Sequence, residues 1–332
     1  MSQYTSLADM DPEVAAVVAQ LPPPPPIVDI NEARIHANGS IDIVKQILEP
    51  QLPDASTYRI QDHQVPVEGG EILVRSIVPV LGTGHETDTF PLLFWMHGGG
   101  WCVGNIELDD YYLRRIAVEM KISVLNVEYR LAPEYTFPTG LNDCYTSLKW
   151  AVDNLPLFQA SLDKGFIIGG CSSGANFSAV LAFRVRDDPY FEGRRLRGQL
   201  LQVPATVHPD AYPDEYKSEL LSIGLKNAPI ISPEMLSTLP KLLGAPPTDP
   251  EFSVLLNTNR KGLAPAYFQI AGFDPLRDEG LLYEKLLREA GVKTKLDVYP
   301  GLPHGAHVLL RHLPVGQKFE NDTKDGIRWL LN

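Results

Sequence analysis

A serine flanked closely by glycines is the first feature of this chain that suggests chemistry. The segment Gly170-Cys171-Ser172-Ser173-Gly174 follows a short apolar run and opens an amphipathic stretch. A strand that turns this sharply into a helix lifts the serine hydroxyl above the sheet, and only small residues fit beside the turn. The start of the helix also favours developing negative charge. Ser172 is therefore predicted to be a nucleophile, although the motif alone fits a plain glycine turn equally well.

Three consecutive glycines, Gly98, Gly99 and Gly100, follow His97 directly after another apolar run. Glycines free the backbone to direct several N–H groups at one point, which is what stabilisation of an oxyanion requires. The N–H of Ser173 would be the further donor. A phosphate-binding loop is the alternative, but the lysine and dinucleotide spacings of such loops are missing. His97 is expected to position the loop rather than to transfer protons.

An acid and a histidine follow the serine, with the acid first. Asp274 comes just after the apolar run 266–271 and His304 just after 294–299, with one predicted helix between them. A right-handed crossover places both residues at the edge of the sheet where Ser172 ends its strand. His304 would then accept the serine proton, and Asp274 would orient the imidazole and stabilise its charged form.

Three neighbouring side chains are rivals for these roles. Asp278 falls at a predicted helix start, where N-capping is the expected role. His307 lies about one turn beyond His304 and is expected to pack. Cys171 could be a nucleophile if its pKa were lowered, but its side chain should point away from the site.

The elements that must position these residues are short apolar runs alternating with amphipathic stretches. This alternation predicts an α/β fold in which a mostly parallel sheet is covered by helices on both faces. The expected strands are 57–65, 71–78, 92–96, 122–127, 166–169, 200–203, 266–271 and 294–299. The expected helices of this core are 109–120, 140–154, 173–186, 278–290 and 316–331.

Two segments interrupt the pattern, and both are predicted to cover the site. Residues 1–50 form an N-terminal cap segment with helices at 12–21 and 29–48. Residues 205–248 lack a strand signal and form a cap insertion, which divides the core into 51–204 and 249–332. The five prolines at 22–26 are expected to be a stiff spacer, with a ligand for a proline-binding module as the alternative.

An apolar pocket could be lined by Trp101, Phe177 and Tyr212. Tyr216 and Leu236 are further candidates from the insertion. These side chains could equally be ordinary packing in the core and the cap, and the sequence leaves both interpretations open.

Taken together, these motifs resemble the hormone-sensitive-lipase-like family of α/β hydrolases. The matching segments are 97–101, 129–134, 137–138, 170–174, 176, 274–278 and 299–304. The resemblance implies an α/β-hydrolase fold with a helical cap, and esterase activity on small or medium acyl esters without a cofactor. Fungal members look most similar. Cys171 and Ser173 depart from the residues that usually flank the family's serine, so substrate preference need not follow typical members.

The composition narrows the class of partner. The net charge of −12 over 332 residues repels nucleic acid and anionic membrane surfaces. No apolar run is long enough for a membrane-spanning helix, and no secretory leader is evident, so a cytoplasmic location is expected. Three widely spaced cysteines indicate neither a disulfide framework nor a zinc site. The expected partner is a small-molecule ester, and no metal is expected. The sequence leaves the oligomeric state open, and a homodimer is one of the possibilities.

Three functions are compatible with this sequence. The first is a serine carboxylesterase that works through an acyl-enzyme. The second uses the same residues for acyl transfer, lactone chemistry or elimination when the cap excludes water. The third is a non-catalytic small-molecule receptor. Because the serine and the histidine both stand at the expected places, the receptor is disfavoured. The sequence does not separate the first function from the second, and the esterase activity that the resemblance implies makes the first the prediction.

Overall fold

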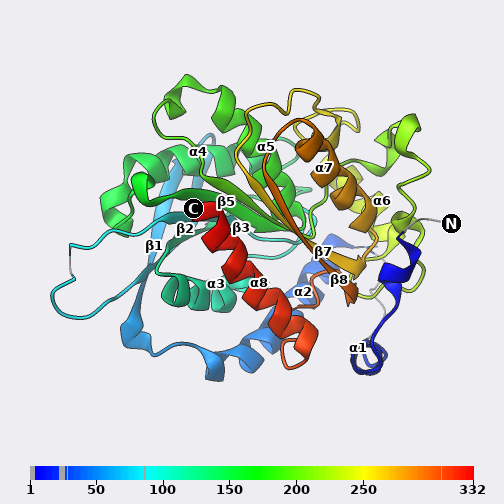
Figure 1. Ribbon diagram of the computed structural model, residues 1–332, viewed down its shortest axis with the longest axis horizontal. Helices are drawn as coiled ribbons and strands as arrows, with labels where there is room; N and C mark the ends of the chain where they lie inside the picture. The colour runs from blue at the N-terminus through cyan, green and yellow to red at the C-terminus, as the bar shows by residue number, and fades with distance from the viewer. Residues whose placement is uncertain (1–3, 22–26, 28, 86, 308) are drawn as a thin grey trace.

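An eight-stranded sheet forms the centre of the computed structural model (Figure 1), which describes residues 4–21, 27, 29–85, 87–307 and 309–332. The strand order is β1-β2-β4-β3-β5-β6-β7-β8. β1 runs antiparallel to β2 and β2 to β4, and all other neighbours are parallel. The strands are β1 Tyr58–Val67, β2 Gly70–Pro79, β3 Leu92–Met96, β4 Ser123–Glu128, β5 Phe166–Cys171, β6 Gly198–Gln202, β7 Ala266–Phe273 and β8 Thr294–Pro303. The predicted mostly parallel α/β sheet is confirmed.

The inner strands are apolar because both of their faces are covered. Every residue of β3, β5 and β6 is buried, whereas β1 at one edge alternates between buried and accessible positions. Continuous burial explains why these strands appear in the sequence as short unbroken apolar runs. Because β5, β6, β7 and β8 run parallel to one another, the carboxyl ends of β5, β7 and β8 lie at the same edge of the sheet.

Helices cover both faces of the sheet (Figure 1). One apolar cluster packs α3 and α8 against the sheet, and the other packs α4, α5 and α7 against its opposite face. The helices are α1 Pro12–Val18, α2 Ile30–Leu48, α3 Glu107–Met120, α4 Thr139–Asp153, α5 Ser173–Asp187, α6 Pro233–Leu243, α7 Arg277–Glu289 and α8 Pro314–Leu331. Among the described residues, no helix is long and apolar enough to cross a bilayer.

Of the two segments outside the regular alternation, the N-terminal one is mainly helical where it is described, and the insertion is less than half helical. Residues 4–21 and 29–50 contain α1 and α2, while the proline run 22–26 lies outside the described residues. The insertion 205–248 contains α6 and three short 3₁₀ turns and, as expected, no strand among its described residues. Arg34 of α2 donates to the carbonyl oxygens of Cys102 and Ala132 at 2.9 and 2.8 Å, and so ties the N-terminal segment to the core.

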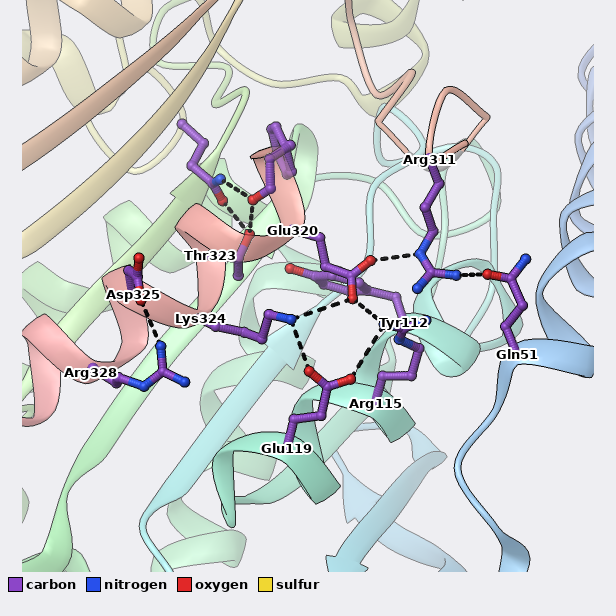
Figure 2. Close-up of polar contacts among 12 residues, drawn as sticks. Gln51, Tyr112, Arg115, Glu119, Arg311, Glu320, Thr323, Lys324, Asp325 and Arg328 are labelled. Atoms are coloured by element: carbon purple, nitrogen blue, oxygen red, sulfur yellow. Dashed lines mark hydrogen bonds and ion pairs between the residues drawn. The ribbon is translucent and has the colours of Figure 1, made fainter. Parts of the chain in front are cut away.

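A cluster of charged side chains joins α3 and α8 on one face of the sheet (Figure 2). The Glu320 carboxylate accepts hydrogen bonds from Arg115 and Arg311, both at 2.6 Å. Lys324 pairs with Glu119 at 2.8 Å. Guanidinium–carboxylate bonds of this kind are among the stronger polar contacts in proteins. Since Arg311 belongs to the loop after β8, the cluster fixes the segment that carries the C-terminal part of the site.

Candidate functional site

Ser172 occupies the turn between β5 and α5. Its backbone has φ 55° and ψ −116°, a sparsely populated conformation that costs of order 1–3 kcal/mol and persists only when the surrounding structure enforces it. The Ser172 N–H donates a hydrogen bond to the carbonyl oxygen of Gln202, at 2.9 Å, and this bond helps to hold the conformation. β6 thus holds the turn in place, and the side chain stays 8 % exposed.

The glycines on both sides of Ser172 are required by contact with the backbone. A Cβ at Gly170 would lie 2.4 Å from the carbonyl carbon of Gly174. A Cβ at Gly174 would lie 1.9 Å from the carbonyl oxygen of Met96, at the end of β3. Neither neighbour is a flexible side chain, so the strand can enter the helix this closely only with glycine at both positions.

The three residues predicted as a triad lie within hydrogen-bonding distance of one another. His304 Nε2 is 3.0 Å from Ser172 Oγ, and His304 Nδ1 is 2.8 Å from Asp274 Oδ2. The second carboxylate oxygen, Asp274 Oδ1, accepts the backbone N–H of Leu276 at 2.8 Å. Pairing of Phe273 with the residue before His304 explains why Asp274 and His304 leave the sheet side by side. The arrangement suits proton transfer from Ser172 to His304, with the carboxylate holding the imidazole.

The rival residues have other surroundings. Asp278 does not cap α7, whose N-cap is Leu276, so the predicted capping role is wrong. Its carboxylate instead accepts the N–H groups of Leu221 and Ser222, at 3.0 and 2.7 Å, and so anchors the insertion to α7.

His307 and Cys171 are both buried in surroundings that disfavour their charged forms. His307 stacks on Phe319 with ring centres 4.1 Å apart, and burial lowers its pKa to about 3. Burial also raises the pKa of the Cys171 thiol well above its usual range. A neutral imidazole packed on a ring and an un-ionised thiol fit structural roles.

The glycine loop after β3 lies directly beside Ser172. Met96 pairs with Gly170 across the sheet, so the loop leaves β3 next to the turn. A Cβ at Gly98 would lie 3.2 Å from the carbonyl oxygen of Cys171, and one at Gly99 would lie 2.0 Å from that of Val103. Gly99 and Gly100 have φ of 118° and 57°. The loop therefore needs glycine both for space and for its backbone conformation.

His97 holds this loop and is not in contact with the reacting side chains. Its Nδ1–H donates to the carbonyl oxygen of Gly98 at 2.7 Å, and burial lowers its pKa to about 4. The ring stacks on Tyr129 at 4.3 Å, and the Tyr129 hydroxyl donates to the His97 carbonyl oxygen at 2.8 Å. Through these contacts Tyr129 braces the glycine loop.

A small cavity of about 20 Å³ opens beside Ser172. That is room for about one water molecule. Its walls include Trp101, Ser172, Leu236, Leu239, Phe252 and Glu279. The two leucines come from α6, and Leu239 touches the loop so closely that a Cβ at Gly100 would lie 2.4 Å from its Cδ1. Side chains of α6 therefore close this cavity on the side of the glycine loop.

Of the three residues predicted to line an apolar pocket, only Trp101 is in the wall of this cavity. Phe177 does not line it within the described part of the chain, and packs edge-on against Tyr129 at 5.1 Å. Tyr212 reaches the wall indirectly, since its hydroxyl donates to Glu279 Oε2 at 3.0 Å.

Glu279 and Leu239 line the cavity but were not predicted as site residues. The available signal for Glu279 was its place five residues after Asp274, near the start of a helix. For Leu239 the sequence carried no signal, because the path of the insertion over the sheet depends on tertiary contacts.

Comparisons with known proteins agree with this geometry. The profile of the α/β hydrolase fold family matches residues 93–308. The versiconal hemiacetal acetate esterase of Dothistroma septosporum is 37 % identical over 250 residues, 74 % of this chain and 75 % of the relative. A carboxylesterase of Mycobacterium tuberculosis is 31 % identical over 255 residues, 74 % of this chain and 75 % of that protein.

Solved structures show the same likeness over nearly the whole chain. A vibralactone cyclase superposes with a TM-score of 0.94 at 42 % identity, covering 98 % of this chain and 96 % of the cyclase. An esterase of Pyrobaculum calidifontis superposes with a TM-score of 0.82 at 28 % identity, covering 97 % and 99 %. The predicted resemblance to hormone-sensitive-lipase-like enzymes and the prediction of a carboxylic-ester-hydrolase class are confirmed by these relatives. The chain belongs to the α/β-hydrolase-fold family.

Proposed function

We propose that this protein is a serine carboxylesterase for small acyl esters, with Ser172 as nucleophile, His304 as general base and Asp274 as the residue that orients it. The observation that carries the proposal is the continuous hydrogen-bonded chain from Ser172 Oγ through both ring nitrogens of His304 to Asp274 Oδ2. A buried carboxylate in this position stabilises the imidazolium that forms as the serine proton is transferred.

The reaction then proceeds in two acyl transfers. Ser172 Oγ attacks the ester carbonyl while its proton passes to His304, and the protonated imidazole returns that proton to the departing alcohol. Water next attacks the acyl-enzyme with His304 again accepting the proton, and the acid leaves as Ser172 is restored. Both steps pass through a tetrahedral oxyanion beside Ser172.

The backbone N–H groups of Gly98, Gly99 and Gly100, together with that of Ser173, are proposed to stabilise this oxyanion. The proposal is supported by the contact between the glycine loop and the serine turn. One such donor is typically worth about 3 kcal/mol in the transition state. The neutral, buried His97 keeps the loop in place without adding a second base.

Residues 1–50 and 205–248 are proposed to act together as the cap over the site. The insertion places α6 against the glycine loop, and Asp278 anchors it to α7. The N-terminal segment is attached through Arg34. With a cavity this small, the cap sets the acyl length that the enzyme accepts.

A chain-length series tests this part of the proposal. With p-nitrophenyl esters from acetate to laurate, kcat/KM is expected to peak at two to four carbons, since the cavity has little room between Ser172 and α6. Leu239→Ala removes the side chain that touches the loop and is expected to move the optimum by at least two carbons, at about 1 kcal/mol per buried methylene. Leu242→Ala, a change on the same helix at a residue that does not line the cavity, is the control. An unchanged profile in Leu239→Ala would contradict a limit set by the cap.

Lactone chemistry is a second candidate, favoured by the similarity to the vibralactone cyclase. In that case a hydroxyl of the bound acyl group, instead of water, attacks the acyl-enzyme, and His304 accepts its proton. Mass spectrometry of the products of a hydroxyacyl ester in H₂¹⁸O separates the two outcomes. Hydrolysis gives an acid that contains one ¹⁸O, and cyclisation gives an unlabelled lactone.

A further inference from the structure

Glu279 contributes the carboxyl group of the cavity beside Ser172. It is in the first turn of α7, is 2 % exposed and lines the same cavity as the candidate nucleophile. Ser172 is polar, but Leu236, Leu239 and Phe252 in the same wall are apolar. Burial of a carboxyl group among such residues is costly unless it has partners or a function.

The hydrogen bonds that described residues make to Glu279 leave one of its carboxyl oxygens with unused capacity. Oε1 accepts the backbone N–H groups of Thr206 and Val207, at 2.6 and 3.4 Å. Oε2 accepts the Tyr212 hydroxyl, at 3.0 Å. A carboxyl oxygen can take part in two hydrogen bonds, so Oε2 retains one site.

The carboxyl group is poised to be neutral at neutral pH. Burial is the main cause that raises its pKa to about 8, and the negative charge of Asp274 adds to the effect. The hydrogen bonds from Thr206, Tyr212 and Val207 act in the opposite direction but do not cancel it. A protonated carboxyl group suits an uncharged polar partner. A cation would gain little attraction from the neutral carboxyl group, and an anion would be repelled by the carboxylate that forms when the proton is lost.

Trp101 lines the same cavity and carries an unused hydrogen-bond donor. Its side chain is 6 % exposed and lines the cavity, and its Nε1–H is buried without a hydrogen-bond partner among the described residues. An orphaned buried donor costs about 1–3 kcal/mol. A group that accepts from the indole and also bonds Oε2 would satisfy both, and a hydroxyl group can do so.

We propose that Glu279 and Trp101 form a polar subsite that binds a hydroxyl group of the substrate close to the scissile ester. This inference rests on the esterase function proposed above and narrows its substrate class to hydroxylated esters. Glu279 thereby acts as a specificity-determining residue, and the apolar remainder of the wall surrounds the carbon atoms of the substrate.

Two matched pairs of esters test the proposal at pH 7. On the acyl side, p-nitrophenyl 3-hydroxybutyrate is compared with p-nitrophenyl 3-methylbutyrate, in which a methyl group replaces the hydroxyl. On the alcohol side, 2-hydroxyethyl butyrate is compared with propyl butyrate, with acid release followed by pH-stat. We expect the wild-type protein to prefer the hydroxylated member of one pair by about tenfold in kcat/KM, since a site built for a hydroxyl discriminates against its absence. The pair that shows the preference tells whether the hydroxyl belongs to the acyl or the alcohol group.

Two substitutions locate that preference. Glu279→Gln keeps an acceptor for Thr206 N–H, and Trp101→Phe keeps the ring that packs on Phe252. Each is expected to reduce the preference at least threefold, mainly through KM of the hydroxylated ester. Glu284→Gln is the control: it changes a buried glutamate of the same helix that bonds Thr294 and does not line the cavity. It should leave the preference unchanged.

Equal kcat/KM for both members of both pairs in the wild type would overturn the inference, whether or not the variants fold. So would variants that slow both members of a pair equally, which is the signature of a purely structural role. These outcomes leave esterase activity intact. Failure of the proposed function has a different signature: no ester is turned over, and a fluorophosphonate does not label Ser172.

Discussion

Ser172→Ala is expected to lower kcat/KM for p-nitrophenyl butyrate by about 10⁴- to 10⁶-fold while leaving the fold intact. Removal of the nucleophile eliminates the acyl-enzyme route, and the remaining rate reflects the oxyanion donors and substrate binding alone. The alanine methyl group fits where the serine Cβ already lies, so the thermal midpoint should stay within a few degrees or rise as one polar group is removed from a buried site.

Ser178→Ala is the matched control for this experiment. Ser178 lies on α5, the helix that follows Ser172, and is also buried, but its hydroxyl donates to the carbonyl oxygen of Gly174 rather than contacting His304. Its loss should change kcat/KM less than threefold. Initial rates at equal concentrations of folded protein compare the two variants, and a fluorophosphonate should label Ser178→Ala but not Ser172→Ala. A Ser172→Ala protein with near wild-type turnover would rule out Ser172 as nucleophile and point to another residue.

Gly174→Ala is expected to give the largest loss of stability among single methyl additions near the site. The new Cβ would lie 1.9 Å from the carbonyl oxygen of Met96 and 2.6 Å from that of His97. Both are backbone atoms at the end of β3, so α5 must shift away from the sheet. Overpacking against backbone should cost at least about 3 kcal/mol, which lowers the thermal midpoint by roughly 5–10 °C. Because the shift opens the turn at Ser172, activity should fall at least 100-fold.

Gly39→Ala provides the contrast for that variant. Gly39 lies in the exposed part of α2, and an added Cβ would meet no heavy atom within 4 Å. Alanine is preferred over glycine inside helices by about 0.5–1 kcal/mol, so the thermal midpoint should stay the same or rise slightly. Circular dichroism melts and ester assays compare the two variants. Equal stability of Gly174→Ala and the wild type would mean that the turn tolerates a side chain and is less tightly packed than described.

Local chemistry in the sequence was sufficient to predict which segments would form the strands of the site and which candidate residues would follow them. The apolar runs before Ser172 and Asp274 are buried on both faces of the sheet, so their composition alone identifies them as inner strands. The run before His304 belongs to β8, an edge strand that is only partly buried. Strand ends were less predictable. β7 continues to Phe273 and β8 to Pro303, because pairing between these two strands extends past glycines that appear in the sequence as turn signals.

The tertiary structure decided the contacts that depend on where the insertion lies. Asp278 looked like a helix cap, yet it binds Leu221 and Ser222, more than fifty residues away. Glu279 and Leu239 face the cavity for the same reason: α6 crosses the glycine loop.

The sequence by itself determined the order and spacing of the nucleophile, the acid and the histidine, because short-range turn geometry and the right-handed connection of parallel strands leave few other placements. Only the tertiary structure decided the size and polarity of the cavity beside Ser172. Cap segments pack through side chains distant in sequence, and no local pattern fixes which of them meet.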